Sequence, residues 1–152
     1  MNKLLKSLLI ICITLYSLGC KTTIPATAEV NFLNANNGVI NLRSIGYGKT
    51  NEECLQNAQK NAFETLFFRG IPGSQQNTPL ISINEKEKSE SKKYFEEFYA
   101  NSRYKTFLTS IQPAFDYRKV KGGKSVSVDL GINLQSLRAD LESNNIIRKF
   151  GY

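Results

Sequence analysis

Residues 125–134, SVSVDLGINL, alternate apolar and other side chains without a break, and this stretch decides the fold. The apolar positions, which all fall on one face, are Val126, Val128, Leu130, Ile132 and Leu134. A period of two predicts an antiparallel strand with one buried face and one solvated face. The preceding residues 121–124, KGGK, predict a tight hairpin turn, because glycine readily adopts the positive φ angles that such turns require.

Two further strands are predicted around this hairpin. Residues 107–120 contain regularly placed apolar side chains and are interrupted by Pro113, which predicts an edge position or a bulge because proline cannot donate to the ladder. Residues 39–48, VINLRSIGYG, are rich in β-branched residues and end in a Gly-Tyr-Gly turn. Leucines 134, 137 and 141 then predict a short helix that ends at Asn144 and Asn145.

The clearest helix signal covers residues 51–69. Thr50 and Glu53 have the spacing of a capping box, in which the threonine oxygen accepts an early backbone N–H. Apolar residues then recur every three or four positions, at Cys54, Leu55, Ala58, Ala62, Phe63, Leu66 and Phe67. The small side chains in this stripe favour a close approach of the helix to a sheet. Gly70 predicts the end of the helix.

These elements predict one α+β domain over residues 38–152, in the order β-α-(α)-β-β-α. Its sheet is expected to be mainly antiparallel and to carry the 51–69 helix on one face. The opposite face, which bears Ser127, Asp129 and Asn133, is expected to be solvated or covered by a partner.

Residues 1–20, MNKLLKSLLIICITLYSLGC, have the organisation of an export signal. Lys3 and Lys6 precede an apolar run that is shorter than the roughly 20 residues needed to span a bilayer, so residues 1–19 are predicted to be a cleaved signal peptide. The stretch ending in Cys20 resembles the lipobox of bacterial lipoproteins, although Ser17 stands where leucine is usual. The resemblance implies acyl chains on Cys20, and a non-lipidated secretory signal is the alternative.

The same resemblance implies a location for the protein. Lys21 is not the aspartate linked with retention in the inner membrane, and no acidic run follows Cys20. The expected location is therefore the bacterial outer membrane, with the acyl chains in the lipid and the domain facing the periplasm. Residues 20–37, polar and low in apolar content, are predicted to form the lipidated cysteine and a flexible tether.

The composition argues against several classes of chemistry. The chain contains no histidine, which removes Ser-His-Asp and Cys-His catalysis and the commonest zinc ligand. Loss of Cys12 with the signal and acylation of Cys20 leave Cys54 alone, either as a buried small hydrophobe or as a reactive thiol. Gly-Tyr-Gly-Lys-Thr at 46–50 lacks the spacing of a phosphate loop. No catalytic residue, metal or cofactor is predicted, and the protein is not expected to be an enzyme.

The formal net charge of the chain is +7. Such an excess fits attraction to anionic headgroups or wall polymers, and it fits solubility equally well. No cluster of Lys and Arg is interleaved with stacking aromatics, so nucleic acid is not an expected partner.

A densely charged stretch, residues 85–93, is followed by aromatics at helical spacing. We predict a partner-binding surface here, formed by Tyr94, Phe95, Phe98, Tyr99, Tyr104, Lys92, Lys93 and Arg103. Aromatic and arginine side chains are enriched where interfaces concentrate binding energy. The alternative is that these aromatics pack into the core.

One resemblance extends over most of residues 39–134. The strand ending GYGKT, the helix ECLQNAQKNAFETLFFRGI and the hairpin FDYRKVKGGKSVSVDLGINL resemble a small envelope domain found in certain lipoproteins and in the N-terminal part of the flagellar H-ring assembly protein. The charged 85–105 segment and Ser125 depart from that pattern. The resemblance implies an α+β module used for assembly or accessory binding, and it supplies no catalytic residues.

The expected function is therefore that of a lipid-anchored cell-envelope protein, a non-catalytic accessory or assembly factor that binds another envelope component. Two alternatives stay open. One is a wall- or lipid-acting enzyme that uses carboxylates. The other is a binder of anionic wall or surface polymers through Lys86, Lys88, Lys92, Lys93, Arg103 and Lys105.

Overall fold

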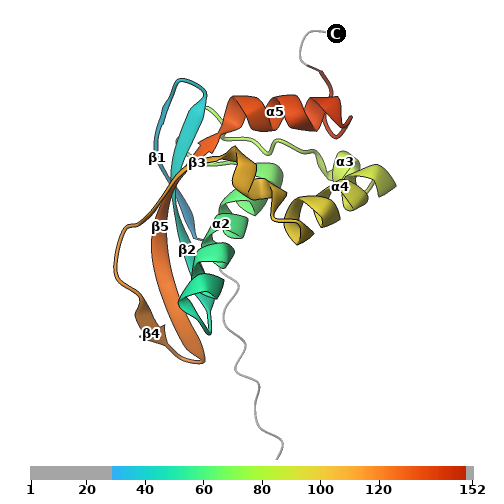
Figure 1. The fold of residues 1–152 in the computed structure, drawn as a ribbon. Helices are drawn as coiled ribbons and strands as arrows, with labels where there is room; N and C mark the ends of the chain where they lie inside the picture. Colours follow the sequence, from blue (N-terminus) through green and yellow to red (C-terminus); the bar gives the residue numbers. More distant parts are fainter. Residues whose placement is uncertain (1–28, 150–152) are drawn as a thin grey trace, which may run out of the picture.

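Strand β5 (Gly123–Asn133) is the central strand of the sheet in the computed structural model, which describes residues 29–149 (Figure 1). It pairs on one side with β2 (Val39–Gly48) and on the other with β3 (Leu108–Pro113) and β4 (Arg118–Val120). Strand β1 (Val30–Asn36) completes the order β1-β2-β5-β3 beside β2. Every pairing is antiparallel, which confirms the predicted α+β class with an antiparallel sheet.

The helices all lie on one side of this sheet (Figure 1). Helix α2 (Asn51–Phe68) packs directly on β2 and β5. The shorter segments α3 (Ile83–Lys86), α4 (Ser89–Ala100) and the 3₁₀ turn η1 (Arg103–Phe107) lie beyond it, and α5 (Leu134–Ser143) follows β5. The core therefore forms between the sheet and α2, and α4 and α5 close it at the sides.

Helix α2 begins with the predicted capping box. The Thr50 hydroxyl accepts a hydrogen bond from the Glu53 backbone N–H at 3.1 Å. The Glu53 carboxylate in turn accepts from the Lys49 backbone N–H at 2.7 Å. Gly70, with φ of 78°, ends the helix in the left-handed region that glycine tolerates.

The contact between α2 and β2 is unusually close. A Cβ atom placed on Gly46 would lie 2.0 Å from the Cys54 carbonyl oxygen and 2.8 Å from the Ala58 Cβ. The Ser44 hydroxyl donates to the Ala58 carbonyl at 2.7 Å in the same region. Small side chains on the helix were predicted for this purpose, and the sheet contributes its own glycine opposite them.

The two faces of β5 differ as its alternation predicts. Val126, Val128, Leu130 and Ile132 are buried against α2. On the opposite face the Arg43 guanidinium of β2 forms two bonds to the Asp129 carboxylate, at 2.7 and 2.8 Å. Ser127, Asp129 and Asn133 are only partly exposed, since neighbouring strands flank them.

The strand predicted over residues 107–120 is divided in the structure: Phe107 ends η1, and the rest forms the separate strands β3 and β4. The predicted edge position and irregularity are found in β3. It pairs with β5 only, its register shifts between Leu108 and Ser110, and it ends at Pro113. Gly122, with φ of 88°, forms the turn between β4 and β5, as the glycine pair predicts. Pro113 lies at the end of the edge strand β3, where a missing backbone donor costs the ladder little.

The predicted tether over residues 20–37 is wrong for residues 30–36, which form β1. Asn37 and Gly38, with φ of 50° and 76°, make the two-residue turn that joins β1 to β2. Asn-Gly is the preferred sequence for such a turn, so the signal was present in the sequence. The domain therefore starts before residue 38. Residues 1–28, which include the predicted signal peptide and Cys20, lie outside the described part of the chain.

Candidate binding groove beside helix α4

Helix α4 places its aromatic side chains in two rows. Tyr94 and Phe98 face the core and are 5% and 0% exposed, and Tyr104 on η1 is 1% exposed. The Phe98 ring lies 5.5 Å from Phe63 and 5.8 Å from Phe107, measured between ring centroids. The prediction of a partner-binding surface is therefore wrong for Tyr94, Phe98 and Tyr104, which belong to the core.

The second row, Phe95 and Tyr99, is half-buried and lines a groove of about 660 Å³. Helix α2 contributes one wall of this groove through Glu64 and Phe68. The remaining lining residues are charged and come from the segment 86–96: Lys86, Glu87, Lys92 and Glu96. We call this feature the α4 groove.

The apolar floor of the α4 groove is formed by three aromatic rings, those of Phe68, Phe95 and Tyr99. Phe95 packs 5.1 Å from Phe67 and 5.2 Å from Phe68, so its inner edge joins the core. The Lys86 ammonium lies 4.3 Å from the centre of the Phe68 ring, and the Lys60 ammonium lies 5.9 Å from that of Tyr99. Cations at this range are attracted by the ring faces, which holds the lysines over the floor.

The Tyr99 hydroxyl is buried at the groove and has no hydrogen-bond partner within residues 29–149. Burial raises the pKa of this phenol well above its usual range, and the nearby Glu64 carboxylate raises it further. Glu64 lies close enough to act through its charge without meeting the geometry of a hydrogen bond. Tyr99 therefore stays neutral and keeps a donor without a partner, which is costly in a buried position.

The three cations of the predicted partner-binding surface also lie in different places. Lys92 lines the α4 groove, whereas Lys93 is exposed outside it. Arg103 instead ties α4 to α5, because its guanidinium pairs with Asp140 and lies 4.8 Å from the Tyr94 ring centre. Tyr94 donates to the same Asp140 carboxylate at 2.6 Å. Arg103 therefore has a structural role, and that it also binds a partner stays a prediction.

Cys54 lies in the core beneath β2, with no exposed surface. Its thiol donates to the Lys124 carbonyl at 3.3 Å, and burial raises its pKa. A buried thiol with a raised pKa is a poor nucleophile. The structure therefore favours a buried hydrophobe over a reactive thiol.

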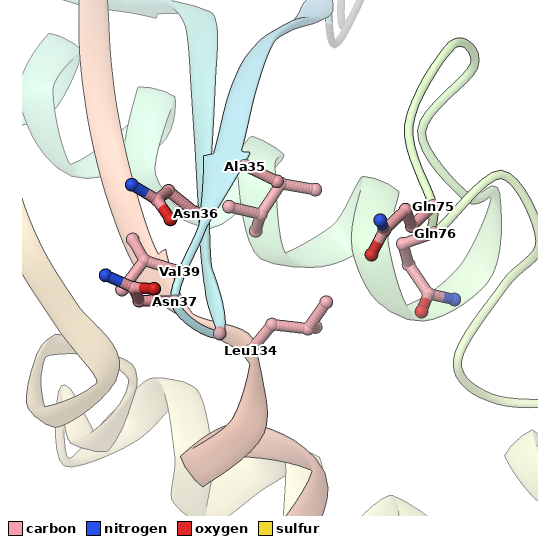
Figure 2. Close-up of a pocket in the computed structure, with 9 residues that line it drawn as sticks. Ala35, Asn36, Asn37, Val39, Gln75, Gln76 and Leu134 are labelled. Carbon is pink, nitrogen blue, oxygen red and sulfur yellow. The ribbon is translucent and has the colours of Figure 1, made fainter.

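A second hollow, of about 240 Å³, lies between the β1–β2 turn and the loop after α2 (Figure 2). Asn37 and Val39 line one side, and Gln75 and Gln76 line the other. The Gln76 side chain is already bound, donating to the Thr78 carbonyl and accepting from Arg138. The Gln76 amide therefore stabilises the loop and is not free to bind a ligand.

Residues 29–149 contain no helix long and apolar enough to cross a membrane, and no cluster of three side chains suited to a metal ion. Comparisons with protein-family models, with curated proteins and with solved structures each found no match. The resemblance to the flagellar H-ring assembly domain therefore stays a prediction. The α4 groove is the strongest candidate site on geometric grounds.

Proposed function

We propose that the protein is a lipid-anchored envelope protein that acts as a non-catalytic accessory or assembly factor. It binds a segment of another envelope protein in the α4 groove. The observation that carries this proposal is the groove floor, where Phe68, Phe95 and Tyr99 stay partly exposed between charged side chains. An aromatic centre with a polar rim is the usual anatomy of a protein interface.

The rim supports a peptide segment as the occupant. Lys86 and Lys92 lie beside Glu64, Glu87 and Glu96, so both signs of charge surround the floor. A uniformly charged polymer would meet repulsion from half of this rim. An amphipathic protein segment carries both signs and has an apolar side chain to place on the rings.

The anchor supports the envelope location. Two or three acyl chains on Cys20 give stable attachment, because each buried CH₂ contributes roughly 0.8 kcal/mol and one chain alone is marginal. Nine residues lie between Cys20 and Val30, and they reach at most about 32 Å when extended. The domain therefore works close to the membrane, which we propose to be the outer membrane on its periplasmic side.

The groove gives no support to the alternative of a carboxylate enzyme. Its acidic residues, Glu64, Glu87 and Glu96, are all exposed to solvent. Acid/base chemistry with two carboxylates needs environments that separate their pKa values, usually by burying one of them. The exposed carboxylates of the α4 groove therefore favour a binding function over acid/base catalysis.

The test is crosslinking in intact envelopes, followed by purification of the full chain and mass spectrometry. The double variant Phe95→Ala/Tyr99→Ala should capture about tenfold less of the partner protein, since a loss of 1.4 kcal/mol in binding is tenfold. Phe115→Ala is the matched control, because this ring is 54% exposed on the other face of the sheet. Equal capture by both variants would show that the α4 groove does not bind the partner.

The anchor is tested separately with a fatty-acid probe. Cys20→Ser should abolish labelling and leave the chain uncleaved or released from the membrane. Labelling that persists in this variant would contradict the lipoprotein assignment.

A further inference from the structure

The chain after α5 folds back and forms a cleft with the loop after α2 and the start of α4. Two adjoining hollows, of about 460 and 330 Å³, share Ile147 and Arg148 as lining residues. The other lining residues of the first are Ser82, Asn84, Lys88, Asn145 and Lys149, and those of the second are Gln76, Thr78, Pro79, Leu80 and Arg138. We call the two hollows together the basic cleft.

The charges that the described side chains bring to this cleft all have one sign. Lys88, Arg138, Arg148 and Lys149 line it, and no carboxylate is among the lining residues whose side chains the structure describes. With the side chains that the structure describes, Lys88, Arg148 and Lys149 form no ion pair. The cleft thus differs from the α4 groove, where lysines and glutamates alternate.

One of these cations is held in place by the protein. Arg138 donates to the side-chain oxygen of Gln76, which is 3% exposed and donates in turn to the Thr78 carbonyl. This bond fixes the guanidinium at the cleft without neutralising its charge. A fixed guanidinium beside exposed lysines is well suited to carboxylate or phosphate oxygens.

We propose that the basic cleft binds an acidic polymer of the cell wall through its carboxylate or phosphate groups. The assignment rests on the proposed envelope location of the protein. The cleft is concave and runs over two hollows, which suits an inserted chain better than the flat surface of a bilayer. Unpaired cations that lose solvent contact to such a chain gain charge-assisted hydrogen bonds.

The position of the cleft favours a wall polymer over the anchoring membrane. The β1–β2 turn contacts the start of α5, where the Leu134 N–H donates to the Gly38 carbonyl at 2.8 Å. Val30, where β1 begins, lies about 20 Å from this turn along the strand. Helix α5, which is ten residues long, then runs away from the sheet for a further distance of about 15 Å (Figure 1). The cleft follows α5, so it lies at the end of the domain far from the point where the tether enters.

The test is co-sedimentation of the full chain, in a neutral detergent, with purified cell-wall sacculi. Arg148→Gln/Lys149→Gln should weaken binding about tenfold, because each exposed ion contact changes affinity by a factor of about three to five. Lys119→Gln/Lys121→Gln is the matched control, since it removes the same charge at exposed positions around β4. Soluble poly-γ-glutamate should release the wild-type chain, and higher salt should weaken binding.

Two results would overturn this proposal. One is equal binding by the cleft variant and the control variant, with melting temperatures that show both to be folded. The other is release of the chain from sacculi by phosphatidylglycerol in the micelles but not by poly-γ-glutamate, which would make the ligand a lipid headgroup. Phe95→Ala/Tyr99→Ala should sediment normally, so failure of the α4 groove is distinguishable from failure of the basic cleft.

Discussion

Strand β5 and helix α4 are both dense in apolar side chains, yet the sequence determines the environment of one and not of the other. In β5 the period of two sends every apolar residue to the same face, and that face is buried. In α4 the aromatics come as adjacent pairs, 94/95 and 98/99, and adjacent residues point about 100° apart on a helix. The pairs therefore form two rows, and only packing decides that one row is core and the other lines a groove.

The largest expected effect tests the β5 half of this comparison. Val128→Asp would place an unpaired carboxylate at a side chain that is fully buried. The cost is several kcal/mol, which rivals the total stability of about 5–15 kcal/mol for a domain. We expect insoluble or protease-sensitive protein. Ser125→Asp, on the opposite face and paired with Arg118, is the control and should stay folded.

A folded Val128→Asp protein would mean that this face of the sheet is exposed in solution. The assignment of α2 to that face would then be wrong. Limited proteolysis and circular dichroism on both variants measure the difference directly.

The next effect separates the two rows of α4. Phe98→Ala removes a ring that contacts Phe63, Tyr104 and Phe107, and should lower the free energy of unfolding by about 3–5 kcal/mol. Phe95→Ala should cost roughly half as much, because part of that ring is already in solvent. Urea denaturation of the two single variants gives both values. Equal losses in the free energy of unfolding would show that Phe95 belongs to the core and does not line an open α4 groove.

The sequence predicted the fold wherever a single pattern was sufficient. The 125–134 alternation, the Thr50 cap and the glycine turn at 122–123 each depend on neighbouring residues only. Strand β1 was missed because its exposed, asparagine-rich segment has little apolar content, although Asn37-Gly38 marks the turn. Gly46 was interpreted as part of a turn, and its close contact with α2 became visible only when the helix was placed over it.

The candidate sites depend on residues that are far apart in the sequence. The α4 groove combines Phe95 and Tyr99 with Glu64 and Phe68 of α2. The basic cleft combines Lys88 with Arg148 and Lys149, about sixty positions later. Local periodicity carries no information about such contacts, so the sequence pointed to the right segment for the groove and missed the cleft.

The smallest expected effect compares two tyrosines of α4 that differ in one hydrogen bond. Tyr94→Phe loses the bond to Asp140, which lies at 2.6 Å, and should reduce the free energy of unfolding by about 1–2 kcal/mol. Tyr99→Phe removes a buried hydroxyl that has no partner within the described chain, so stability should stay unchanged or rise slightly. Both changes delete a single oxygen from the same helix, and their difference in urea denaturation isolates the bond. An equal loss in the two variants would show that the Tyr99 hydroxyl is bonded in solution, to Glu64 or to water.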